Sequence, residues 1–228
     1  MMNVTRLWRY AQASFGLGGL NRTTMSLTGK PRELISRIFQ YSGEVLQPIQ
    51  VEEELVKLVE DVGELRPATV VEIGTSMGGT LYLWTRLAQP DALIISVDLP
   101  GGKFGGGYSR LRTPLYRRFA RDRQELHLMR ANSHEVSTLA EVKRLLGGKT
   151  VDFLFIDGDH TYEGVKQDWE MYSPLVRTGG LVAFHDVAGN YDDTQVKKHW
   201  DAIKGGYVHR EYMVDPRGFY GIGVIVKQ

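Results

Sequence analysis

Hydrophobic and polar residues follow two alternating patterns along this chain. Short runs rich in apolar residues occupy positions 69–73, 92–97, 125–129, 151–156 and 180–184. Such runs are typical of strands buried on both faces of a parallel sheet. Around them, apolar residues recur every three or four positions. This second pattern predicts helices over residues 31–39, 51–65, 81–87, 113–121, 137–146, 162–176 and 194–203.

The alternation of strands and helices predicts an α/β fold with a Rossmann-like, doubly wound, mostly parallel sheet. Right-handed crossovers between parallel strands place helices on both faces of such a sheet. Residues 207–214 and 221–226 are two further predicted strands, and the Asp-Pro-Arg-Gly turn at 215–218 indicates a C-terminal antiparallel hairpin. We therefore expect a seven-stranded sheet in one domain, residues 47–228. Residues 1–46 are expected to form an N-terminal extension with a short helix.

Composition and charge narrow the class of protein. The net charge of +1 gives no overall field that favours nucleic acid or an anionic membrane. The absence of cysteine excludes disulfides, thiolate metal sites and cysteine nucleophiles. The sequence has neither the apolar run of a signal peptide nor an apolar stretch of about 20 residues. We expect a cytoplasmic protein without nucleic-acid or membrane partners, and a homo-oligomer stays open.

A glycine-rich turn follows the first predicted strand. Residues 74–79 read Gly-Thr-Ser-Met-Gly-Gly, directly before a predicted helix. Glycines let the backbone approach a ligand closely, and free N–H groups at a helix start suit polar or anionic groups. An ordinary tight turn is the alternative interpretation. The turn lacks the close Gly-x-Gly spacing of dinucleotide-binding proteins, which disfavours a nicotinamide-dependent oxidoreductase without excluding it.

Polar side chains follow the other strands, at the edge where α/β sheets bind ligands. Asp98 ends the second strand and can accept hydrogen bonds from a ribose, or it can cap the loop. Asp157, Asp159 and His160 follow the fourth strand, and His185 and Asp186 end the fifth. Adjacent strand ends lie about 5 Å apart. Asp157, His185 and Asp186 can therefore converge on one divalent cation, Mg²⁺ or Mn²⁺, or form a hydrogen-bonded cluster without metal.

Taken together, these motifs resemble the class I S-adenosylmethionine-dependent methyltransferases. The resemblance is carried by Val71-Glu-Ile-Gly-Thr-Ser-x-Gly-Gly, Asp98, Phe155-Ile-Asp-Gly-Asp-His and Gly179-Gly-Leu-Val-x-x-His-Asp, and covers roughly residues 47–226. Within the class, the sequence is most similar to the macrocin-type and cephalosporin hydroxylase-like small-molecule O-methyltransferases. The resemblance implies methyl transfer to a hydroxyl of a natural product or sugar, assisted by a divalent metal. A non-catalytic S-adenosylmethionine-binding protein stays an alternative.

The same resemblance implies a role for each motif residue. For the methyl donor, it implies Glu72, Gly74, Thr75, Ser76, Gly78 and Gly79 at the methionine part, Asp98 at the ribose, Asn132 and Ser133 beside adenine, and a contact with Asp157. For the cation, it implies the ligands Asp157, His185 and Asp186, although an acid is usual where this chain has His185. It also implies Asp159 or His160 as general base, and Asp159 is preferred because it can share one face with Asp157.

Overall fold

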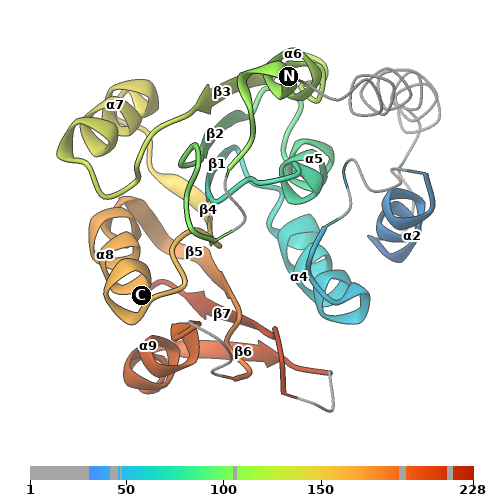
Figure 1. Cartoon of the computed structure of the whole chain (residues 1–228). Helices are drawn as coiled ribbons and strands as arrows, with labels where there is room; N and C mark the ends of the chain where they lie inside the picture. The colour runs from blue at the N-terminus through green and yellow to red at the C-terminus, as the bar shows by residue number, and fades with distance from the viewer. Residues whose placement is uncertain (1–30, 42–45, 47, 105–106, 190–193, 215–217) are drawn as a thin grey trace.

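A computed structural model describes residues 31–41, 46, 48–104, 107–189, 194–214 and 218–228. Seven strands form one sheet in the order β3-β2-β1-β4-β5-β7-β6 (Figure 1). The strands are β1 (Thr69–Ile73), β2 (Leu93–Val97), β3 (Glu125–Met129), β4 (Val151–Ile156), β5 (Val176–His185), β6 (Val208–Tyr212) and β7 (Ile222–Val226). Strands β1 to β5 run parallel, and β7 pairs antiparallel with both β5 and β6. The predicted seven-stranded, mostly parallel sheet with an antiparallel C-terminal hairpin is confirmed.

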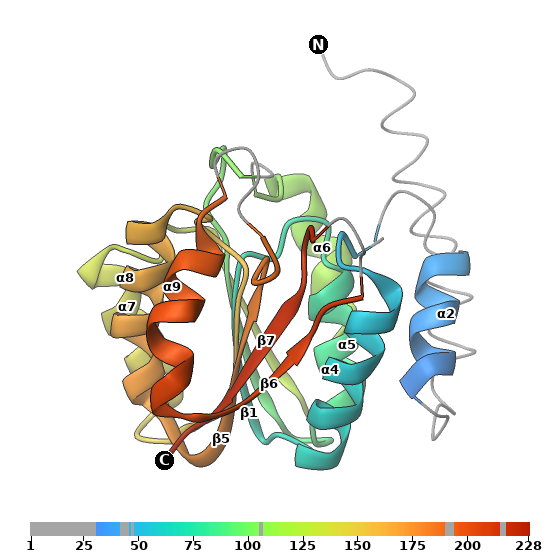
Figure 2. The same ribbon diagram turned by 90° about the horizontal axis from the view of Figure 1, so that it is seen from below.

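Helices cover both faces of the sheet (Figure 2). One face carries α4 (Glu52–Leu65), α5 (Gly79–Leu87) and α6 (Thr113–Arg117), and α2 (Pro31–Tyr41) packs on α4. The other face carries α7 (Val136–Leu146), α8 (Tyr162–Tyr172) and α9 (Val196–Ile203). Successive strand residues point to opposite faces, so Val70 joins one apolar cluster while Val71 joins the other. This two-sided burial explains the continuous apolar runs of the central strands.

The order of the strands creates the place where a ligand can bind. Strand β1 pairs with β2 on one side and with β4 on the other, so the chain changes direction across the sheet after β3. The connections that follow β1 and β4 therefore lead away in opposite directions and leave a crevice at the carboxyl ends of these strands. The polar residues singled out in the sequence lie at this edge.

Two predicted elements differ from the observed ones for identifiable reasons. The helix expected over residues 113–121 ends at Arg117, after a short 3₁₀ turn at Arg110–Arg112. Beyond it, the Arg121 guanidinium donates hydrogen bonds to the carbonyls of Thr85, Arg86 and Ala88 at the end of α5, which a continued helix would prevent. Helix α8 ends at Tyr172 and continues as a 3₁₀ turn, Ser173–Leu175, because Pro174 cannot continue the helical hydrogen bonds.

Some expectations concern residues outside those that the structure describes. Residues 1–30 and the centre of the predicted hairpin turn, residues 215–217, belong to this group. Of the predicted extension, α2 is described, and it buries Leu34, Ile35 and Ile38 in the same apolar cluster as α4. None of the described helices is long and apolar enough to cross a membrane.

Candidate active site

Two adjoining cavities lie at the carboxyl ends of the central strands. The first, which we call the β5-side cavity, has a volume of about 380 Å³ and reaches His185 and Asp186 at the end of β5. The second, the β2-side cavity, has a volume of about 280 Å³ and reaches Asp98 at the end of β2. The walls that both cavities share are formed by Gly74, Ser76, Lys103, Phe104 and Asp157. The glycine turn and the tip of β4 therefore separate two spaces of small-molecule size.

The glycine turn fits tightly against the tip of β4. Gly74 has a φ of +86°, and a Cβ atom there would lie 1.9 Å from the carbonyl oxygen of Asp157. Only glycine satisfies both the backbone angle and the close approach. On the other side of the turn, the Tyr116 hydroxyl donates a 2.8 Å hydrogen bond to the carbonyl of Ser76. The turn is thus held from both sides, and its shape is fixed without a ligand.

Glu72 lies beneath the turn and lines neither cavity. Its carboxylate accepts hydrogen bonds from Thr75 Oγ1 at 2.7 Å and from Trp84 Nε1 at 2.8 Å. Complete burial raises the pKa of Glu72 to about 7, although these donors act in the opposite direction. The sequence implied a position beside the ligand, but alternation along β1 directs this side chain toward Trp84 of α5. In the structure, Glu72 supports Thr75, which does line the β5-side cavity.

Replacing Glu72 with glutamine is expected to make stability less dependent on pH. The ordinary pKa of 4.5 is raised to about 7 in the folded protein, so between these values the folded state keeps a proton that the unfolded chain has lost. The free energy of unfolding contributed by this group therefore falls as pH rises through that window. Glutamine has no such proton, and its amide can still pair with Thr75 and Trp84. Urea unfolding at several pH values will show that the free energy of unfolding declines less steeply with pH for Glu72→Gln than for wild type. An equally steep decline contradicts the raised pKa of Glu72.

The residues expected around a nucleoside converge on the β2-side cavity. Asp98 is 7% exposed, and its Oδ2 accepts a hydrogen bond from the backbone N–H of Tyr108 at 2.8 Å. Burial raises the pKa of Asp98. Asn132 and Ser133 line the same cavity, where the Tyr172 hydroxyl holds the carbonyl of Ser133 at 2.7 Å. The cavity therefore offers one buried carboxylate at the end of β2 and a fixed polar turn after β3.

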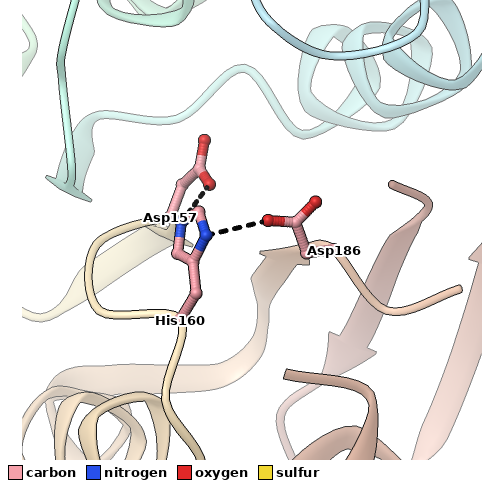
Figure 3. A group of neighbouring side chains, drawn as sticks. All are labelled: Asp157, His160 and Asp186. Atoms are coloured by element: carbon pink, nitrogen blue, oxygen red, sulfur yellow. Dashed lines mark ion pairs between the residues drawn. The ribbon is translucent and has the colours of Figure 1, made fainter. Parts of the chain in front are cut away.

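Two carboxylates and an imidazole meet in the β5-side cavity (Figure 3). His160 Nδ1 lies 3.1 Å from Asp186 Oδ2, and His160 Nε2 lies 3.5 Å from Asp157 Oδ1. These three residues offer ligand atoms that all lie within 4.8 Å of one another, close enough to hold one metal ion. Burial lowers the pKa of His160, but its two carboxylate neighbours outweigh burial and raise it. The group can thus bind a cation or, without one, a proton.

His185, the other residue expected to bind the cation, lies next to this group. The group of ligand atoms above contains His160 and does not include His185. His185 Nδ1 instead lies between the carboxylates, 3.1 Å from Asp157 Oδ1 and 3.4 Å from Asp186 Oδ1. Burial lowers the pKa of His185, but these two acids outweigh it and raise the pKa to about 9. In its protonated form, His185 balances the negative charge of the two acids, and its role as a cation ligand stays a prediction.

The structure separates Asp159 from His160. Asp159 lines the β2-side cavity, and its Oδ1 accepts a hydrogen bond from the backbone N–H of Thr161 at 2.9 Å, just before α8. His160 lines the β5-side cavity, where the ring of Phe104 stacks on it at 4.8 Å. Two neighbouring residues of one turn therefore face different spaces, and Asp159 does not share the side of Asp157 that faces His160.

Several residues of the two cavities were not anticipated from the sequence. Gln50 donates a 2.7 Å hydrogen bond from Nε2 to Asp157 Oδ2 across 107 positions of the chain. Tyr220 lines the β5-side cavity and stacks on His185 at 5.9 Å. His134 lines the β2-side cavity, with Nε2 lying 3.3 Å from the buried Asp168. No local sequence motif marks these residues.

Comparison with known proteins points to a single family. A family model described as a methyltransferase domain matches residues 71–187, just over half of the 228 residues. The uncharacterized protein y4gI of Sinorhizobium fredii is 28% identical over 60% of this chain, and the uncharacterized protein R132 of Acanthamoeba polyphaga mimivirus is 30% identical over 52%. The aligned segments span 14% and 51% of the lengths of these two relatives.

Solved structures share the fold at low sequence identity. The O-methyltransferase TomG of Streptomyces achromogenes, solved in complex with SAM, aligns over 100% of both chains with a TM-score of 0.56 and 16% identity. The MycE methyltransferase of the mycinamycin biosynthetic pathway, solved with Mg, SAH and mycinamycin VI, aligns with a TM-score of 0.53 and 19% identity. That alignment covers 89% of this chain and 55% of MycE.

Proposed function

Because the chain belongs to the methyltransferase-domain family, we propose that it transfers a methyl group from S-adenosylmethionine to a hydroxyl of a small molecule. One observation carries the proposal: two cavities of small-molecule size adjoin at the switch point of the sheet and share Asp157 as a wall. A donor in one cavity and an acceptor in the other can then be aligned for direct transfer. TomG, an O-methyltransferase solved with SAM, and MycE, solved with Mg and SAH, support this choice.

The β2-side cavity is proposed as the donor site. Asp98 can accept hydrogen bonds from both ribose hydroxyls, because its carboxylate lines this cavity at the carboxyl end of β2. The Asn132–Ser133 turn borders the space left for adenine. Gly74 and Ser76 line both cavities, so the methionine part of the donor would pass along the glycine turn toward the acceptor.

The β5-side cavity is proposed to bind the acceptor hydroxyl and a divalent cation. Asp157 and Asp186 offer the oxygen ligands that Mg²⁺ and Mn²⁺ prefer, and the imidazole of His160 shifts the preference toward Mn²⁺. A bound cation would lower the pKa of the acceptor hydroxyl. Asp157 and Asp186 fix the orientation of the His160 ring, whose ring nitrogens both face a carboxylate. In its neutral form and without a bound cation, His160 is the side chain of this cavity positioned to take the proton of the acceptor hydroxyl.

Of the two candidate bases in the turn after β4, His160 is expected to contribute more to kcat than Asp159. His160→Gln removes a group that faces the acceptor cavity, and we expect kcat to fall by about a hundredfold. Asp159→Asn leaves an oxygen that can still accept the hydrogen bond from Thr161, so the loss should be much smaller. Steady-state methyl transfer measured for both variants tests the ranking. A larger loss for Asp159→Asn restores Asp159 as the base.

The function is tested by titrating the protein separately with S-adenosylmethionine and with NAD in a calorimeter. We expect binding of the methyl donor alone, whereas binding of NAD alone favours an oxidoreductase. Incubation with methyl-labelled donor and a panel of hydroxyl compounds, with and without a chelator, then tests transfer. Donor binding without transfer to any acceptor favours a non-catalytic binding protein. Transfer that survives removal of divalent cations overturns the metal-assisted form of the proposal.

A further inference from the structure

Gln50 connects the segment before α4 to the centre of the β5-side cavity. The residue lines this cavity together with Asp157, His160 and Asp186, and it is only 6% exposed. Its Nε2 donates a 2.7 Å hydrogen bond to Asp157 Oδ2. A buried amide that contacts a candidate cation ligand is well placed to contribute to the same site.

The carbonyl oxygen of the Gln50 amide, Oε1, does not take part in the hydrogen bond to Asp157. The Asp157 carboxylate can only accept hydrogen bonds, so the Gln50 amide must present its nitrogen to Asp157. Gln50 Oε1 is buried and has no hydrogen-bond partner among the residues that the structure describes. Because the two polar atoms of an amide are about 2.3 Å apart, Oε1 lies within about 5 Å of Asp157 Oδ2. An unpartnered oxygen thus lies beside a carboxylate, an arrangement that neither residue stabilises.

We propose that Gln50 Oε1 is a further ligand of the divalent cation that Asp157, His160 and Asp186 would hold, an inference that rests on the proposed function. A cation would satisfy the unpartnered oxygen and neutralise the negative charge that surrounds it. Amide carbonyl oxygens suit Mg²⁺ and Mn²⁺ as ligands, and six-coordinate ions leave positions open beyond the three residues already named. The same amide would then both bind the ion and orient one of its carboxylate ligands.

The alternative explanation is that Gln50 only orients the Asp157 carboxylate and does not itself contact the cation. Hydrogen bonds to ligating carboxylates stabilise metal sites, and their loss costs about tenfold to a hundredfold in affinity. Gln50→Met therefore weakens binding under either explanation. Gln50→Glu distinguishes the two explanations, because an ionised glutamate supplies a ligand oxygen with added negative charge but cannot donate a hydrogen bond to Asp157. A direct ligand predicts unchanged or tighter binding for Gln50→Glu, and an orienting donor predicts weaker binding.

The test is a calorimetric titration of the full chain with Mn²⁺, comparing wild type, Gln50→Met and Gln50→Glu. Gln167→Met, an exposed change on α8, is the matched control. We expect Gln50→Met to bind Mn²⁺ about tenfold or more weakly, and Gln50→Glu to bind at least as tightly as wild type. Water-proton relaxation of bound Mn²⁺ should report one additional water in Gln50→Met, since water takes the position of Oε1.

Weaker binding by Gln50→Glu, unchanged binding by Gln50→Met, or a wild type that binds no Mn²⁺ overturns the inference. If Gln50→Met does not fold, the comparison of Gln50→Glu with wild type still decides between ligand and orienting donor. S-adenosylmethionine is titrated into the same samples. Donor binding without Mn²⁺ binding refutes the Gln50 inference alone, whereas absence of donor binding by wild type refutes the proposed function.

Discussion

Replacing Asp157 with asparagine is expected to lower kcat for methyl transfer by about a thousandfold. Asp157 is one of the residues that line both cavities, and its carboxylate contacts His160, His185 and Gln50. Burial raises the pKa of Asp157, but the neighbouring histidines outweigh burial and hold it at about 2, so the carboxylate is ionised at neutral pH. Asparagine can still accept the hydrogen bond from Gln50, but it removes the negative charge that a cation or a protonated histidine requires.

The measurement is steady-state transfer of a labelled methyl group, with donor affinity measured in parallel. Asp122→Asn is the matched control, because Asp122 is exposed and its φ of +52° is tolerated by asparagine. We expect Asp122→Asn to retain wild-type activity and Asp157→Asn to keep its fold. An Asp157→Asn enzyme with near-normal kcat would show that the acid cluster is structural.

Replacing Gly74 with alanine is expected to destabilise the fold by about 3 kcal/mol or more and to abolish donor binding. A Cβ at this position would lie 1.9 Å from the carbonyl oxygen of Asp157, and the φ of +86° is unfavourable for any side chain. The clash is with backbone, so no rotamer change relieves it. Either the glycine turn or the tip of β4 must move, and both form walls of the two cavities.

Urea unfolding and calorimetric titration with S-adenosylmethionine measure the two effects. Gly205→Ala provides the control, because a Cβ there meets nothing within 4 Å and the change should alter stability by about 0.5 kcal/mol or less. A Gly74→Ala protein with wild-type stability and donor affinity would mean that the turn is not built around this contact.

The architecture could be predicted from the sequence because it depends on local patterns. Short continuous apolar runs and period-3.6 repeats of apolar residues are properties of short segments, and they predicted the strands and helices in their order along the chain. The Asp-Pro-Arg-Gly turn predicted the C-terminal hairpin. The convergence of Asp98, Asn132 and Asp157 was also predictable, because carboxyl ends of parallel strands meet at one edge of a sheet. The helix at 113–121 was predicted too long, because the contacts of Arg121 with α5 come from distant residues.

The sequence by itself determined which strand ends carry acids, histidines and glycines, since those positions follow from the chain alone. Only the tertiary structure decided which way each side chain turns. It directed Glu72 into the core, His160 rather than Asp159 toward Asp186, and Gln50 onto a carboxylate 107 positions away. The physical reason is that side-chain orientations within a turn and contacts between distant segments depend on how helices and strands pack together. Local sequence periodicity does not specify that packing.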